Sequence, residues 1–325
     1  MTRSVAESSF VEFLRSDLHE PIGALFERQA ARHPDRLAVK GARRSFTYAE
    51  PDASANLLAH AILARRGSGS EPIALLLEHD APVLAAILAV VKAGKIYVGL
   101  DAHHPTARLR GVVEDSGTPL IVCDDTHLAR ARELASTSCE LLEMTALGES
   151  ASAPPPGLRV SARAPACISY TSGSTGDAKG VVGDQCAITH RAMVFINGAR
   201  IAPGDRLALL ESVAVGGSFR GIFGALLTGA SVLPFDLRAE GIDALAPWFS
   251  REQITICSFA ASVFRHFAGG LSESSALPAL RYLGVGREAV SRGDVDLYRA
   301  RCAWVRLRQR DGRRRGGHDV RVHDR

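Results

Sequence analysis

Short apolar runs alternate with helix-like stretches along most of this chain. The strand-like runs of the first half cover 37–40, 45–48, 72–77, 96–100 and 119–123. Between them lie segments with helical spacing, of which 81–93 is apolar almost throughout and is ended by Gly94. Alternation of strands and helices favours α/β layers with largely parallel sheets.

Length and composition exclude several classes of protein. The chain has 325 residues, 46% of them hydrophobic and 23% charged, which is globular and longer than one ordinary domain. Its longest apolar run, within 81–91, is too short to span a bilayer, and residues 1–7 show no apolar signal core. The six cysteines lie far apart without a C-x-x-C pair, so free thiols, no metal site and a cytoplasmic location without membrane partners are expected.

Composition shifts divide the chain. Residues 151–158 form a Pro-rich, polyproline-like connector between a first α/β subdomain, 1–150, and a second, 159–300. The remainder, 301–325, is Arg-rich, lacks core periodicity and is expected to be disordered. From Arg299 to the end there are ten Arg and three Asp, a balance of +7. Because the whole chain carries +4, the body is mildly acidic at −3.

Residues 170–181 carry the most specific chemistry, reading Tyr-Thr-Ser-Gly-Ser-Thr-Gly-Asp-Ala-Lys-Gly-Val. Glycines let a backbone approach a ligand and aim successive N–H groups at one point, and hydroxyls add donors. Lys179 adds a compact positive charge in a chain with only four lysines among its 39 basic residues. The segment therefore predicts a phosphate-binding loop, and a flexible Ser/Gly linker is the alternative.

Two familiar nucleotide-binding motifs are not present in this segment. The Walker loop requires Gly-Lys-Ser/Thr, whereas Lys179 follows Ala178 and precedes Gly180. No strand-GxGxxG-helix unit occurs either, so a Rossmann dinucleotide site is not supported.

The segment resembles the signature loop of the adenylate-forming (AMP-binding) enzyme superfamily at every fixed position except Ala178, where the family has Pro. Residues 46–50, 91–101 and 280–289 resemble further family elements in the expected order, with Arg287 in place of a Gly. The chain is thus identified as similar to the N-terminal part of an acyl-CoA synthetase or a non-ribosomal peptide synthetase adenylation domain, from about residue 20 to 300. This resemblance implies two stacked α/β subdomains with largely parallel sheets, incomplete at the C-terminus.

The resemblance also implies a reaction. A carboxylic acid attacks the α-phosphorus of ATP, pyrophosphate leaves, and the acyl-adenylate passes to a thiol of CoA or of a carrier protein's phosphopantetheine arm. Mg²⁺ bridges phosphate oxygens. Lys179 is the implied catalytic residue, offsetting charge on the leaving pyrophosphate. The implied phosphate-binding residues are Thr171, Ser172, Gly173, Ser174, Thr175, Gly176, Lys179 and Gly180.

The resemblance also fixes the register of a substrate pocket. Residues 222–230 match a family helix, which places Gly216, between Val215 and Gly217, where amino-acid-activating members carry an Asp for the substrate's ammonium. A buried ammonium without a paired charge is costly, so the substrate is expected to lack an α-amino group or to bind it elsewhere. A slip in register is the alternative. The implied adenine- or substrate-lining residues are Val215, Gly216, Gly286 and Glu288, and a solvated turn carboxylate is the alternative for Glu288.

The C-terminal segment departs from the family pattern, because the metal, ribose and second-lysine elements of the full-length family are missing. One interpretation of 303–325 is a basic tail that binds RNA or an anionic surface, and the other is a shift of reading frame after Cys302. Nucleic-acid binding is disfavoured because Trp304 is the tail's only aromatic residue. The alternative to an adenylate-forming ligase is a truncated, inactive remnant that at most binds nucleotide.

Overall fold

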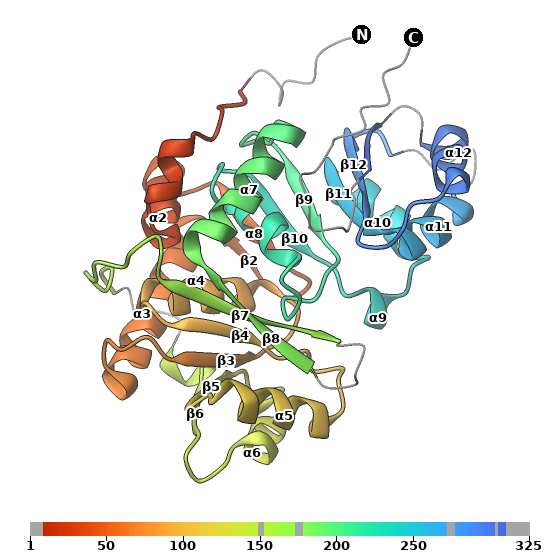
Figure 1. Ribbon diagram of the computed structural model, residues 1–325. Helices are drawn as coiled ribbons and strands as arrows, with labels where there is room; N and C mark the ends of the chain where they lie inside the picture. The colour runs from red at the N-terminus through yellow and green to blue at the C-terminus, as the bar shows by residue number, and fades with distance from the viewer. Residues whose placement is uncertain (1–8, 149–152, 173–177, 272–276, 303–304, 310–325) are drawn as a thin grey trace.

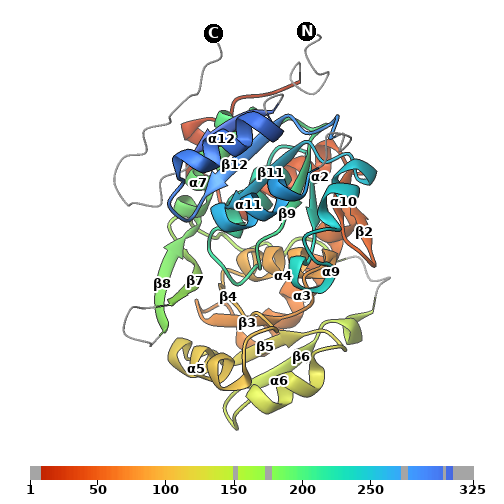
Figure 2. The ribbon, with the colours of Figure 1, turned by 90° about the vertical axis from the view of Figure 1, so that its right-hand side faces the viewer.

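The computed structural model describes residues 9–148, 153–172, 178–271, 277–302 and 305–309. Within these residues the chain forms two sheets, separated by helices and flanked by helices on their outer faces (Figures 1 and 2). None of the described helices is long and apolar enough to cross a membrane.

The first sheet has six strands in the order β6-β5-β3-β4-β7-β8, parallel except for the β7–β8 pair. Its strands are β3 (Pro72–Leu76), β4 (Ile96–Gly99), β5 (Leu120–Cys123), β6 (Glu140–Glu143), β7 (Pro165–Ser172) and β8 (Ala178–Asp184). The helices α5 (Thr106–Ser116) and α6 (Leu128–Leu134) cover its outer face, where Val98, Leu109 and Ile121 belong to one apolar cluster.

The second sheet has seven strands in the order β13-β12-β11-β9-β10-β1-β2, parallel except for β1–β2. Its strands are β1 (Leu37–Lys40), β2 (Ser45–Thr47), β9 (Arg206–Leu209), β10 (Ser231–Pro234), β11 (Ile256–Ala260), β12 (Tyr282–Gly286) and β13 (Arg306–Gln309). Its outer helices are α10 (Leu245–Arg251), α11 (Ala261–Gly270) and α12 (Arg292–Arg301), with the short α9 (Leu237–Glu240) after β10.

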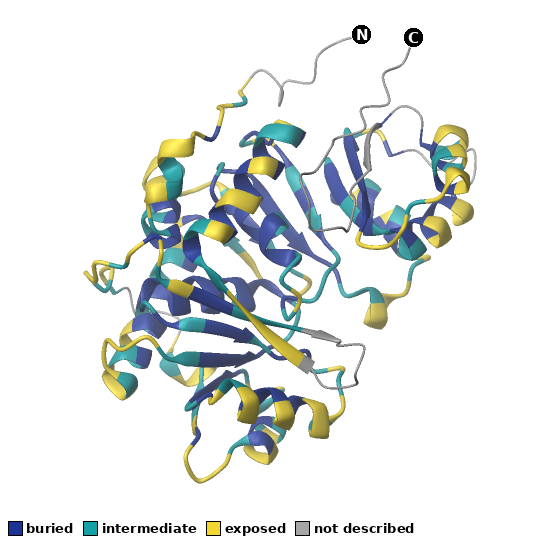
Figure 3. Ribbon diagram, viewed as in Figure 1, coloured by how far each residue is buried: buried dark blue, intermediate teal, exposed yellow. Residues whose placement is uncertain are grey.

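The main core lies between the two sheets. It is filled by α2 (Ile22–Arg32), α3 (Ala49–Arg66), α4 (Ala81–Lys92), α7 (Gln185–Ala199) and α8 (Ser218–Leu226). Of the twelve residues of α4, all but Pro82 are buried, as the apolar stretch predicts (Figure 3). Two 3₁₀ turns, η1 (Arg15–His19) and η2 (Thr145–Leu147), complete the described elements. Strands covered on both faces explain the continuous apolar runs of β3 and β5.

The sheets do not follow the division into 1–150 and 159–300 that the sequence predicts. Strands β1 and β2 belong to the second sheet, where Val39 pairs with Val232, and strands β7 and β8 belong to the first. The connector at 151–158 marks a change in composition, but strand pairing is a long-range choice that composition does not encode. Each sheet therefore needs residues from both predicted subdomains.

The predicted boundary of the tail at 301 also differs from the structure. Residues 306–309 form β13, an edge strand that runs parallel to β12, with Leu283 opposite Leu307. The expectation of disorder was wrong for these four residues, because an edge position lets Arg-rich sequence pair on one side only. Residues 310–325 lie outside the described part of the chain.

Candidate active site

The segment rich in glycine and hydroxyls joins the two strands of an antiparallel hairpin. Thr171 pairs with Lys179 and Ser172 with Ala178, so β7 and β8 bring the two ends of the segment side by side. The predicted residues Gly173, Ser174, Thr175 and Gly176 lie outside the described residues. A hairpin rather than a strand-to-helix turn agrees with the absence of a Walker pattern.

Gly180 has a packing role in this hairpin. A Cβ at this position would lie 3.0 Å from Ile168 Cγ2 and 3.3 Å from the Tyr170 ring. The close approach of these neighbours accounts for glycine here without a ligand.

The four lysines divide into three that are paired and one that is exposed. Lys92 contacts Asp52 and Glu27, Lys95 contacts Glu71, and Lys40 contacts Glu252, all within 3.0 Å. Lys179 is exposed on β8 and has no ion pair among the residues the structure describes. Its charge is thus carried at the end of the hairpin, beside the glycine-rich segment.

The predicted substrate segment packs directly against β7. A Cβ on Gly216 would lie 2.6 Å from Ser169 Oγ, so a side chain at the position where the resemblance places an Asp would require the Ser169 hydroxyl to shift. Two residues further on, the Ser218 hydroxyl donates to the Val215 carbonyl at 2.7 Å and fixes the turn before α8. The predicted substrate residues and the strand that leads into the phosphate-binding segment therefore touch.

An ion pair that the sequence did not predict lies beside this turn. Arg287 has φ +70°, the left-handed conformation that explains why the family pattern has Gly there. Its guanidinium lies 3.0 Å from the Glu211 carboxylate. A Cβ on Gly217 would lie 2.8 Å from Arg287 Nη2 and 3.0 Å from Glu211 Oε2, so the missing side chain makes space for the pair.

Glu288 has a structural partner. Its carboxylate accepts hydrogen bonds from the Ser262 N–H at 2.8 Å and the Ser262 hydroxyl at 2.9 Å, at the first turn of α11. A carboxylate there satisfies an N–H that the helix leaves open and interacts favourably with the helix dipole. Gly286, the last residue of β12, pairs with Ala260 of β11.

A cavity of about 870 Å³ lies where the carboxyl ends of strands from both sheets converge. Its wall includes residues that follow these strands, among them His79, Asp101, Glu211 and Asp236, together with Ser258 of β11. Val215 and Arg287 also line it. Crevices outside the carboxyl ends of parallel strands are the usual ligand sites of α/β sheets.

Burial and charge set the protonation of two groups in this wall. Burial lowers the pKa of His79, whose Nε2 lies 3.0 Å from the Leu209 carbonyl, and so favours a neutral ring there. Burial alone would raise the pKa of Asp101, but the His103 N–H and the nearby Arg238 charge hold it below its usual value. The wall therefore presents a neutral imidazole and an ionised carboxylate.

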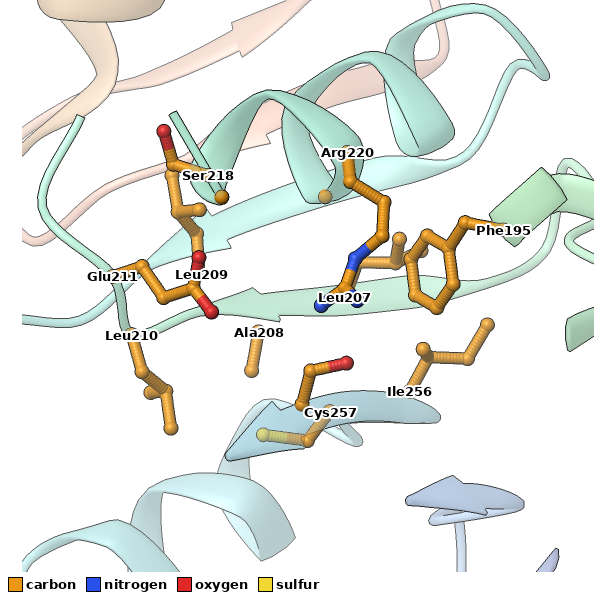
Figure 4. Close-up of a pocket in the computed structure, with 13 residues that line it drawn as sticks. Phe195, Leu207, Ala208, Leu209, Leu210, Glu211, Ser218, Arg220, Ile256 and Cys257 are labelled. Carbon is orange, nitrogen blue, oxygen red and sulfur yellow. The ribbon is translucent and has the colours of Figure 1, made fainter. Parts of the chain in front are cut away.

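A second, smaller cavity of about 20 Å³ adjoins the first and shares Leu210, Glu211 and Ser258 with it. Arg220 of α8 lies in its wall with only 7% of its surface exposed (Figure 4). Its Nε and Nη1 have no hydrogen-bond partner, and its guanidinium lies 4.7 Å from the Phe195 ring centroid. Sequence reasoning missed this residue, although an Arg inside the apolar stretch 219–227 is a visible signal.

The fold is that of the N-terminal subdomains of adenylation enzymes. The Klebsiella oxytoca NpsA N-terminal subdomain in complex with 3-hydroxyanthranilyl-AMSN has a TM-score of 0.77 at 22% identity, covering 91% of this chain and 74% of that one. A bound form of the non-ribosomal peptide synthetase FmoA3 (S1046A), with alpha-methyl-L-serine-AMP, has a TM-score of 0.83 at 22% identity, covering 99% of this chain and 37% of that one.

The model of the AMP-binding enzyme family matches residues 26–309, and the chain belongs to that family. Surfactin synthase subunit 2 of Bacillus subtilis (strain 168) is 29% identical over 279 residues, which are 85% of this chain and 8% of that protein. The chain thus spans a small part of the curated relatives it matches.

Proposed function

We propose that this chain binds ATP and a carboxylic acid and forms an acyl-adenylate. The observation that carries the proposal is the hairpin β7–β8, which bears the family's signature segment and whose strand β7 contacts the substrate turn at Gly216. One packed unit would then hold the phosphates at the end of β7 and the acid beside it.

The residues have distinct roles in this proposal. The hydroxyls and N–H groups of 171–176 hold the β- and γ-phosphates, and Lys179 offsets the charge that develops on pyrophosphate. A carboxylate oxygen attacks the α-phosphorus, the bond to the bridging oxygen breaks, and pyrophosphate leaves. Catalysis of such a transfer consists mostly of positioning and charge stabilisation. Val215, Gly216 and Gly286 are proposed to line the acid or adenine.

Enzymes of this family use ATP with Mg²⁺. Among the described residues there is no group of three or more His, Cys, Asp or Glu side chains placed to hold a metal. This fits Mg²⁺, which keeps several waters and is held largely by substrate phosphates rather than by a protein cage. The ion would neutralise phosphate charge, and the chain's own part is to orient the phosphates.

The acid is proposed to lack an ammonium bound at Gly216, because this residue has no carboxylate to pair with a buried ammonium. The acceptor is proposed to be a thiol, either of CoA or of a carrier protein.

ATP–pyrophosphate exchange with a panel of carboxylic acids tests the proposal. We expect acid-dependent exchange that requires Mg²⁺ and is lost in Lys179→Ala. Arg299→Ala, which removes an exposed charge from α12, is the matched control and should retain exchange. Binding of Mg-ATP without exchange for any acid would contradict catalysis and leave the chain a nucleotide-binding remnant.

A further inference from the structure

Arg220 has a buried charge for which the protein supplies few contacts. Only 7% of its surface is exposed, and its Nε and Nη1 atoms lack a hydrogen-bond partner. The Phe195 ring offers a cation–π contact but no acceptor. Burying a guanidinium without an acceptor is costly, so an acceptor from a ligand would remove a penalty that the free protein carries.

A second hydrogen-bonding group faces the same small cavity. Ser258, on β11, lines it together with Arg220, and its hydroxyl is also buried without a partner. The two residues come from different elements, α8 and β11, on either side of the cavity. Two unsatisfied donors facing one space describe a subsite for a hydrogen-bond acceptor.

The charge of this space favours an anion. Glu211 is paired with Arg287 at 3.0 Å, so that pair is close to neutral, and Arg220 adds a positive charge. Cys257 contributes none, since burial raises the pKa of its thiol well above the usual value. Gly216 brings no carboxylate to the turn before α8. The charge is therefore opposite to that of a pocket built to receive an ammonium.

The dimensions favour a compact group on a longer molecule. A volume of about 20 Å³ admits a group of one or two water-sized atoms. The shared wall residues Leu210, Glu211 and Ser258 make the small cavity a continuation of the large one. Gly217, which has no side chain, lines the small cavity where a Cβ would meet Glu211 and Arg287. A ligand in the large cavity can thus extend one end to Arg220.

We propose that the acid substrate is a dicarboxylic acid, whose second carboxylate is held by Arg220 and Ser258 while the first is activated. Guanidinium–carboxylate hydrogen bonds are among the strongest in proteins, and the Ser258 hydroxyl supplies a further donor. This inference rests on the proposed function, because it names the substrate class of the same site.

Equilibrium binding of acids to the whole chain, without nucleotide, tests the inference by titration calorimetry. The probes are succinate, glutarate and isophthalate, each beside a match with methyl in place of one carboxylate: butyrate, pentanoate and 3-methylbenzoate. We expect at least one dicarboxylate to bind at least tenfold more tightly than its match, and Arg220→Met to abolish that preference. Ser258→Ala should reduce it, which keeps the test usable if the first variant does not fold.

The control is Arg299→Met, which removes an exposed arginine of α12 that lines neither cavity and should keep the preference. Equal binding within every pair, no binding of any dicarboxylate, or a preference that survives both Arg220→Met and Ser258→Ala would overturn the inference. Mg-ATP binding is measured separately. If dicarboxylates are preferred but ATP does not bind, the proposed function fails and the anion subsite stands; the reverse result rejects the subsite alone.

Discussion

Two arginines of this chain, Arg220, which is buried, and Arg281, whose side chain is 14% exposed, have opposite surroundings. Arg281, before β12, donates to both carboxylate oxygens of Asp205 and to the carbonyls of Ala199 and Arg200. Arg220, on α8, is at least as buried but has an aromatic ring beside it and two nitrogens without a partner. A charge that stabilises the fold has its acceptors built in, whereas a charge kept for a ligand lacks them until the ligand binds.

The largest loss of stability is expected from removing a buried carboxylate whose hydrogen-bond acceptors are all used. Asp205 is fully buried, accepts from Arg281 and Thr255, and accepts the Ala202 N–H at 2.8 Å. Asp205→Ala should lower the free energy of unfolding by about 3 kcal/mol, since it leaves the largely buried Arg281 without its carboxylate partner. Urea denaturation followed by circular dichroism measures this.

The matched control for that substitution is Asp296→Ala. Asp296 pairs with Arg299 at 3.7 Å on the surface of α12, and both side chains are more than half exposed. Exposed pairs contribute about 0–1 kcal/mol, so a small change is expected. Equal losses of unfolding free energy in Asp205→Ala and Asp296→Ala would show that the buried ion pair contributes no more than the exposed one.

Lys179 differs from both arginines because its charge is exposed to solvent, where a nucleotide phosphate can reach it. Lys179→Ala should weaken Mg-ATP binding about 10- to 100-fold, because a charge-assisted contact contributes about 1.5–3 kcal/mol. Fluorescent nucleotide titration measures this, with Lys179→Arg expected to keep most of the affinity. An affinity within threefold of wild type for Lys179→Ala would exclude a phosphate contact.

The ion pair between Arg265 and Asp294 makes the stability of the fold depend on pH. The Arg265 guanidinium, 2.6 Å from Asp294, lowers the pKa of that carboxyl to about 2. A lowered pKa stabilises the fold above the unfolded value near 3.8 and loses that contribution as pH falls toward 2. Asp294→Asn should remove about 1–2 kcal/mol at pH 7 and flatten this acid limb, because the partner is partly exposed. The free energy of unfolding is measured at pH 7, 4 and 3. An equal loss of stability with falling pH in wild type and Asp294→Asn would contradict this prediction.

The sequence predicted local features well and long-range ones poorly. Strand β3 and helix α4 begin and end within one residue of the predicted ranges, because apolar runs and turn residues define them locally. The pairing of Val39 with Val232 joins residues far apart in the chain, and no local sequence pattern predicts it.

The same limit applies to the site. The segment 170–181 was recognisable because its chemistry is contiguous. The wall formed by Glu211, Arg220 and Ser258 comes from three elements that only the folded chain brings together. The partner of Glu288 at Ser262 likewise depends on how α11 packs. The register inferred from 222–230 stays a prediction, and it did not reveal the buried charge of Arg220 that follows the turn.

The free energy of unfolding of Arg220→Met, beside that of wild type, tests the central claim most directly. Met has a similar volume and a sulfur that packs well against the Phe195 ring. Because the free protein gains little from this buried charge, the variant should be as stable as wild type or more stable, by up to about 1–4 kcal/mol. A loss of about 3 kcal/mol or more would show that Arg220, like Arg281, serves the fold and is not reserved for a substrate carboxylate.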